Sequence, residues 1–178
     1  MLNAAGNFLR RIAAKAAVLW FFVAIAFVSE LSVFVMLAPV GFDSVWALQT
    51  TLSTEVFQAQ LAGMFERGVA EQYIAHYYYD FVNPFWYSAL VAVLLARGMN
   101  AAGVPASASA LALLPFLAGL LDQVQNLLHL YMVLDTANVA PALVLLANVA
   151  GLLKLALLAL CLLAVPALLA AAHARRRG

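Results

Sequence analysis

The sequence predicts an all-α integral membrane protein, a four-helix bundle with one amphipathic helix in its first outer loop. Three observations support this fold class. The chain of 178 residues is 67% hydrophobic and only 10% charged, whereas soluble domains are about 45–50% apolar and about 25% charged. Four apolar segments are each long enough to cross a bilayer, which takes about 20 residues. Polar residues inside these segments recur at helical spacing, so they share faces.

The expected spans form a single transmembrane domain, residues 1–178. They cover about residues 13–39, 77–96, 108–134 and 141–171. The first span also has features of a signal peptide, because Arg10, Arg11 and Lys15 precede its apolar run. We expect a retained anchor, since this run is long for a signal peptide and no clear cleavage site follows it. The fourth span is longer than needed, and a tilt or a kink at Pro166 would accommodate it.

Charged residues outside the spans are segregated by sign. The N-terminal tail, the connection between spans two and three and the C-terminal tail contain no acid and hold Arg10, Arg11, Lys15, Arg97, Arg175, Arg176 and Arg177. The other connections hold Asp43, Glu55, Glu66, Glu71 and Asp135, opposed only by Arg67. The positive-inside rule then predicts that both termini of this multi-pass protein are cytoplasmic. The net charge of +1 argues against a nucleic-acid partner. The single cysteine, Cys161, excludes a disulfide framework within one chain.

The connection between spans one and two, residues 41–76, is the only long one. Its apolar residues recur at helical spacing and are Phe57, Leu61, Met64, Phe65 and Val69. This pattern predicts the amphipathic helix on the outer surface. Ser53 is its expected N-cap, with Glu55 in the first turn. Two interpretations stay open: a lid packed over the bundle, or a helix that binds a partner or lipid. The aromatic stretch HYYYDFVNPFWY is expected to form an interfacial belt.

Spans two and three each carry a polar stripe. Asp122, Gln125, Asn126 and His129 share one helical face, and so do His76, Asp80, Asn83 and Tyr87. Pro84 interrupts the second span and deprives the carbonyl of Asp80 of its usual amide partner. At this depth such a group must be satisfied inside the protein or by water.

Spans one and four add further polar residues at a similar depth. They are Glu30 in span one, and Asn148 and Lys154 in span four. At about 1.5 Å rise per residue, Glu30, Asp80 and Asn148 fall in the outer half of the membrane, and Asp122 lies just past its middle. We therefore expect one shared polar pocket that opens outward. Lys154 lies deeper, and it either reaches the pocket by its long stem or snorkels away from it.

Clustered carboxylates at a low dielectric favour acid–base chemistry, a proton relay or the binding of a cation. The candidate catalytic residues are Asp122 as the central acid or base, with Glu30 and Asp80 as its partners. The candidate ligand-binding residues are Asn126, His129, Gln125, Asn83, Tyr87 and Asn148. A metal held by His76, Asp80, Asp122 and His129 is a weaker alternative, because no compact metal motif is present. Purely structural hydrogen bonding is the competing interpretation for each polar residue.

Two stretches, YYYDFVNPFWYSALVAVLLAR and LPFLAGLLDQVQNLLHL, resemble a pattern in uncharacterised bacterial four-helix membrane proteins. Asp80, Pro84 and Tyr87 match the pattern D-x-x-x-P-x-x-Y of their second span. Asp122 and Asn126 match the pattern D-x-x-E-N of their third span. This chain has Gln125 where that pattern has Glu. The resemblance implies a bacterial inner (plasma) membrane protein. It brings no established activity.

Three functions remain open on the sequence alone. The first is a membrane protein that binds a small or lipid-like ligand in the pocket, with or without acid–base chemistry. The second is a proton-coupled transporter of a small cation, and the third is a structural or accessory subunit. Membrane lipids and a lipid-like or cationic small molecule are the expected partners, and the sequence allows a homo-oligomer. It names no cofactor and no reaction.

Overall fold

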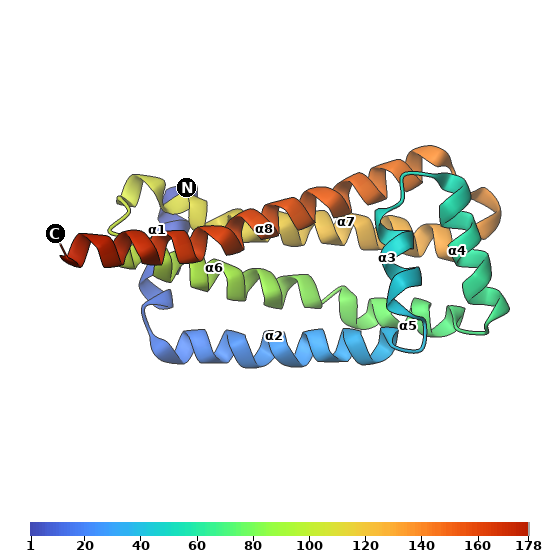
Figure 1. Ribbon diagram of the computed structural model, residues 1–178, viewed down its shortest axis with the longest axis horizontal. Helices are drawn as coiled ribbons and strands as arrows, with labels where there is room; N and C mark the ends of the chain where they lie inside the picture. Colours follow the sequence, from blue (N-terminus) through green and yellow to red (C-terminus); the bar gives the residue numbers. More distant parts are fainter. Residues whose placement is uncertain (178) are drawn as a thin grey trace. The chain divides into compact units, whose positions relative to one another are not determined.

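The computed structural model describes residues 1–177 and confirms the all-helical class, with no strand in that range. Four long helices dominate it: α2 (Ala16–Leu37), α6 (Asn83–Ala101), α7 (Leu114–Leu134) and α8 (Pro141–Arg177) (Figure 1). The shorter helices are α1 (Leu2–Ala13), α3 (Phe42–Thr50), α4 (Thr54–Glu66) and α5 (Ala70–Asp80). Two 3₁₀ helices complete the described chain, η1 (Ala106–Leu113) and η2 (Thr136–Asn138).

Several of these helices are suited to a membrane. Three stretches are long and apolar enough to cross a bilayer, namely Ala16–Leu37, Ala106–Leu134 and Pro141–Arg177. Helices α5 and α6 pass the same criterion only together, as one bent span, which raises the number to as many as four. The second span is thus broken, with Phe81 and Val82 between its two helices. Pro84 stands in the first turn of α6, where its missing N–H is tolerated.

The chain divides into two compact units, and the first comprises residues 1–26, 85–119 and 155–178. In this unit α1 packs on η1, and Gly6 permits the contact, since a Cβ there would collide with the carbonyl of Ser109. Arg10 donates to Asn100 Oδ1 at 2.8 Å and to the carbonyl of Val104 at 2.9 Å. These bonds fasten α1 to the connection between α6 and η1.

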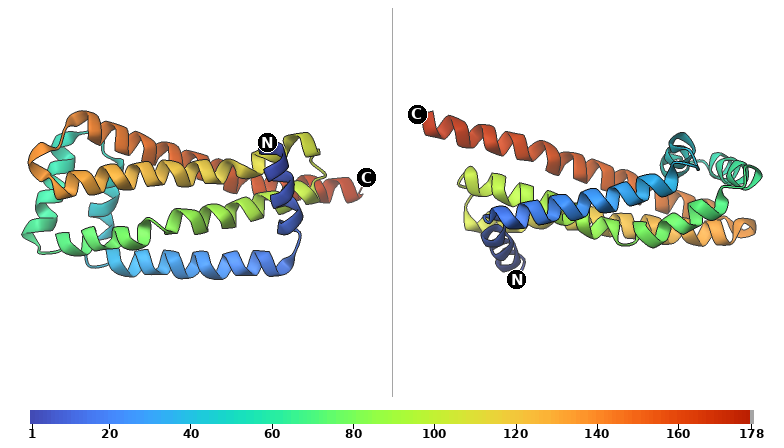
Figure 2. Two further views of the ribbon diagram at one scale, coloured as in Figure 1. Left: turned by 180° about the vertical axis from the view of Figure 1, so that it is seen from behind. Right: turned by 90° about the horizontal axis from the view of Figure 1, so that it is seen from below.

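The second unit comprises residues 27–84 and 120–154. Two helices, α3 and α4, lie across its longer helices (Figure 2), where a single amphipathic helix was expected. The predicted helix and its N-cap are confirmed, although α4 ends at Glu66 and does not include Val69. Ser53 caps it by accepting a hydrogen bond from the amide of Val56. Phe57, Leu61 and Met64 are buried, whereas Phe65 is half exposed. The helix is therefore packed over the unit as a lid.

One residue of the expected aromatic belt, Tyr77, lies instead in the interior of this unit. Tyr73 and Tyr77 of α5 are buried together with Phe57 of α4, and their hydroxyl oxygens lie 3.0 Å apart. Tyr78 and Tyr79 are exposed and fit the expected belt. Tyr77 belongs to a hydrophobic core that also contains Phe57 of α4 and Met132 of α7.

Candidate functional site

The polar stripe of α7 faces the interior of the second unit. Asp122, Gln125, Asn126 and His129 are each at most 5% exposed, while Leu127 on the same helix is 58% exposed. The helical spacing of the four residues therefore predicted their shared orientation correctly. A polar stripe inside an apolar helix must find partners, because an unsatisfied buried polar group costs about 1–3 kcal/mol. Those partners divide the stripe into three parts.

The first part satisfies the break between α5 and α6. Asn126 Nδ2 donates to the backbone carbonyl of Asp80 at 3.1 Å, the same group that Pro84 leaves without an amide. One turn away, Gln123 Nε2 donates to the carbonyl of Phe81 at 2.6 Å. Two side-chain amides of α7 thus replace hydrogen bonds that the broken helix lacks. Asn126 was expected to bind a ligand, and here it supports the backbone.

The second part holds the C-terminal end of α3, whose last carbonyls have no partner within the helix. Asn148 Nδ2 of α8 donates to the carbonyls of Leu48 at 3.0 Å and Thr51 at 2.5 Å. Gln125 Nε2 donates to the carbonyl of Gln49 at 2.9 Å. His129 Nε2 lies 2.8 Å from Asn148 Oδ1 and so orients that amide. These three residues hold α3 against α7 and α8.

The third part is a cluster of charges. Lys154 Nζ lies 2.5 Å from Asp122 Oδ1, and the two side chains are 12% and 6% exposed. The stem of Lys154 therefore does bring its ammonium group to the acid. Asp80, only 8% exposed, lies close enough to interact with the charges of Asp122, Lys154 and Glu30. Two buried carboxyl groups, those of Asp122 and Asp80, thus share the charge of one lysine.

Glu30 lies at the margin of this cluster. Its side chain on α2 is exposed, and its Oε1 accepts a hydrogen bond of 3.2 Å from Asn83 Nδ2. Asn83 is 4% exposed, and its Oδ1 has no hydrogen-bond partner within residues 1–177. A buried acceptor without a donor, next to carboxylates, favours a group that carries N–H and positive charge.

His76 is fully buried beside the cluster. Its Nδ1 is bonded to the carbonyl of Tyr73, and its Nε2 lies 3.8 Å from Asp80 Oδ2. Within residues 1–177, no group of three or more His, Cys, Asp or Glu side chains is arranged to hold a metal ion. The metal alternative therefore lacks a ligand set. His129, one of its expected ligands, is engaged with Asn148.

The candidate site residues do not all lie in one unit. Glu30, Asp80, Asn83, Asp122, Gln125, Asn126, His129 and Asn148 belong to the second unit. Tyr87 is on α6 in the first unit and is partly buried. Several residues of the site were missed as participants. Gln123 had a signal in the sequence, because it precedes Asn126 of the polar stripe by three residues and so lies near it on the helix surface. The others contribute only backbone carbonyls and leave no such signal, namely Leu48, Gln49, Thr51 and Phe81.

The comparisons with known proteins add no assignment. No protein-family model, no curated protein and no solved structure matches this chain. Function must therefore be argued from the geometry of the second unit.

Proposed function

We propose that this chain is a multi-pass membrane protein that binds the cationic group of a small or lipid-like molecule at the charge cluster of its second unit. One observation carries the proposal: the buried carboxyl groups of Asp80 and Asp122 share a single ammonium, that of Lys154, and a third acid, Glu30, lies at their margin. One lysine neutralises one carboxylate. Protons or a bound cation must balance the others, since uncompensated charge at low dielectric is costly.

The contacts favour different roles for Asp122 and Asp80. Asp122 is engaged by Lys154, so the central role expected for it passes to Asp80. Asp80 is buried, lies within reach of His76, and stands at the end of a broken helix. We propose that Asp80 passes its proton to Nε2 of His76 as the cation arrives and then pairs with the cation as a carboxylate. Asn83 Oδ1 would accept a hydrogen bond from the same cation.

A binding experiment tests this proposal. The probe is dodecylammonium, which carries both the positive charge and the N–H groups, titrated into the protein in a neutral detergent. Asp80→Asn should weaken binding by about tenfold, since one charge pair at low dielectric is worth more than 1 kcal/mol. Glu66→Gln, which removes the same charge from an exposed position on α4, should leave binding unchanged. Equal binding by wild type and Asp80→Asn would refute the proposal.

A second candidate, a proton-coupled transporter of a small cation, is favoured by the break between α5 and α6. Transporters commonly place ion and substrate sites at discontinuous helices, and here the break adjoins Asp80. Uptake of a radiolabelled ammonium compound into liposomes under a pH gradient separates the two functions. Gradient-driven uptake that is lost in Asp80→Asn would establish transport. Binding without uptake would leave the chain as a binding protein or an enzyme.

The proposed location and orientation follow from the charges. All seven basic residues of the predicted cytoplasmic segments belong to the first unit. The acidic residues of the chain belong to the second unit. This segregation supports cytoplasmic termini in the inner (plasma) membrane. Reporter fusions at the C-terminus and after Glu66 test the orientation, and they should report opposite sides of the membrane.

A further inference from the structure

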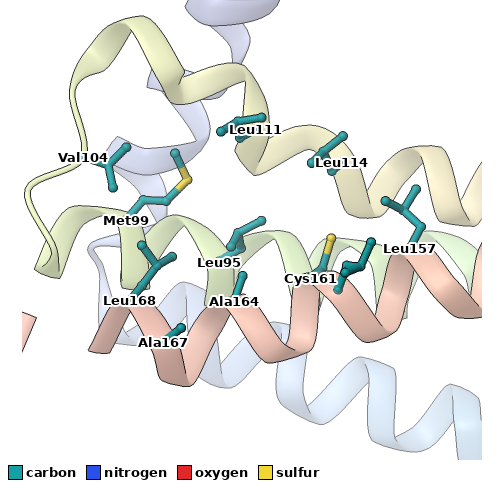
Figure 3. Close-up of a pocket in the computed structure, with 11 residues that line it drawn as sticks. Leu95, Met99, Val104, Leu111, Leu114, Leu157, Cys161, Ala164, Ala167 and Leu168 are labelled. Atoms are coloured by element: carbon teal, nitrogen blue, oxygen red, sulfur yellow. The ribbon is translucent and has the colours of Figure 1, made fainter. Parts of the chain in front are cut away.

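The first unit contains an apolar groove that the proposed function does not use. Its cavity is about 450 Å³, within the size range of small-molecule sites. Figure 3 shows side chains from α6, η1, α7 and α8 converging on it, among them Leu95, Met99, Leu111, Leu114, Cys161 and Ala164. Every lining residue is apolar, so the groove offers its occupant no hydrogen bond or charge.

Positive charge adjoins one end of this groove. Val104 lines the groove with its side chain, and its carbonyl accepts a hydrogen bond of 2.9 Å from Arg10 Nη2. Two residues earlier, the carbonyl of Ala102 accepts a bond of 2.5 Å from Arg175 Nη1. The short connection between α6 and η1 therefore joins the apolar lining to two guanidinium groups. Gly103 permits its turn with a φ of 63°.

Within the described part of the unit, no Asp or Glu side chain neutralises these guanidinium groups. The described part of the first unit contains no Asp or Glu, and Arg10 donates only to neutral acceptors, namely Asn100, Ser109 and the carbonyls of Pro105 and Val104. The side chain of Arg175 is exposed, so its remaining N–H groups face outward. Guanidinium groups of this kind bind phosphate with charge-assisted hydrogen bonds.

We propose that the groove binds one acyl chain of an anionic phospholipid whose phosphate is held by Arg175, with Arg10 adding positive charge beside it. An apolar groove that ends at uncompensated basic residues complements a molecule with a hydrocarbon chain and a phosphate. Lipid is also the surrounding solvent of a membrane helix, so the ligand is always present. This site lies wholly in the first unit and is independent of the charge cluster.

Native mass spectrometry of the detergent-purified protein tests the proposal with three probes: dioleoyl phosphatidylglycerol, dioleoyl phosphatidylcholine and free glycerol phosphate. Wild type should retain phosphatidylglycerol about fivefold more than phosphatidylcholine, the preference expected for about one engaged arginine. Glycerol phosphate should not be retained. Equal retention of the two lipids, or retention of glycerol phosphate alone, would overturn the proposal.

Matched variants locate the site. Ala164→Phe fills the groove and should abolish the specific retention, whereas Ala156→Phe, on an exposed position of the same helix, should not. Arg175→Gln should remove the preference for phosphatidylglycerol while retaining lipid binding, and Arg177→Gln, which loses the same charge nearer the chain end, should keep the preference. If Ala164→Phe loses helical circular dichroism, Leu111→Trp fills the groove from η1 instead. Wild-type retention in a folded groove-filling variant would refute the site.

Discussion

The side-chain amide of Asn126 donates a 3.1 Å hydrogen bond to the carbonyl of Asp80, the backbone group that Pro84 leaves without its helical partner. One residue on α7 thus compensates for a defect in the preceding span. Removing the amide leaves a buried acceptor unsatisfied, which costs about 1–3 kcal/mol. We expect Asn126→Ala to reduce the free energy of unfolding by that amount, measured by denaturant titration in a neutral detergent.

A second substitution separates this effect from simple loss of packing. Pro84→Ala restores an N–H at position 84 and gives the carbonyl of Asp80 a helical donor. In that background Asn126→Ala should cost less than it does in wild type. The same cost in both backgrounds would contradict the compensation of the helix break by Asn126.

Asn148 supports α3, which precedes it by about a hundred residues in the chain. Asn148→Leu removes the donor to the carbonyls of Leu48 and Thr51, and the end of α3 should then open locally. Hydrogen exchange should accelerate in residues 45–51. Asn138→Ala, which removes an exposed amide that donates to the carboxylate of Asp135, serves as the control. Unchanged exchange in Asn148→Leu would refute this role.

Substituting alanine for glycine at two positions should change the stability of the protein in opposite directions. A Cβ at Gly151 would collide with the side-chain amide of Gln125, which is 1% exposed and bonded to Gln49. Gly151→Ala should therefore destabilise the protein by about 1–3 kcal/mol. Gly63 lies inside α4, and no neighbouring atom lies within 4 Å of the place that a Cβ would occupy. Gly63→Ala should stabilise the protein by about 0.5–1 kcal/mol. Thermal unfolding of both variants checks the contrast.

The ion pair between Asp122 and Lys154 should contribute to the stability of the protein. Asp122→Asn leaves the buried ammonium without its nearest carboxylate, and breaking such a pair costs about 3–5 kcal/mol. The double variant Asp122→Leu with Lys154→Met removes both charges and should recover most of the loss. Denaturant titration of the single and double variants measures this difference. Equal losses in the two would show that the pair acts through something other than its charges.

The N-cap of α4 should make the stability of the protein depend on pH. Ser53 Oγ donates to Glu55 Oε2 at 2.5 Å, and this bond lowers the pKa of Glu55 below its ordinary value of 4.5. A carboxyl whose pKa is lowered by folding adds stability above its unfolded pKa and loses it as pH falls through the folded value. The stability gap between wild type and Ser53→Ala should therefore shrink as pH falls below 4.5. Denaturant titrations between pH 7 and pH 3 should show this trend, and Glu55→Gln should abolish it.

The sequence was sufficient to predict what depends on local pattern. The spacing of Asp122, Gln125, Asn126 and His129 determines their common face, and the chemistry of Pro84 determines which carbonyl needs a donor. The apolar spacing of α4 and its Ser53 cap were equally local. Each of these predictions uses residues within a few turns of one another.

The remainder depends on contacts between distant segments. The segment FDSVWALQT lacks a strong helical signal, and α3 is held by Gln125 and Asn148 from other helices. The burial of Tyr77 depends on a core assembled from residues of α4, α5 and α7. Lys154 reaches Asp122 through a side-chain conformation that spacing does not determine. That the N-terminal tail forms helix α1 was also missed, because its contacts with η1 join distant segments of the chain.

The position of Lys154 in the chain has a consequence for biogenesis. Asp122 leaves the ribosome 32 residues before the lysine that neutralises it, and α3 is synthesised about a hundred residues before Asn148. Synthesis proceeds from the N-terminus, so a nascent chain that ends after α7 already carries the acid and the exposed helix end. Asp122 and the end of α3 therefore lack their partners until α8 has been inserted. This final span completes the assembly of the second unit.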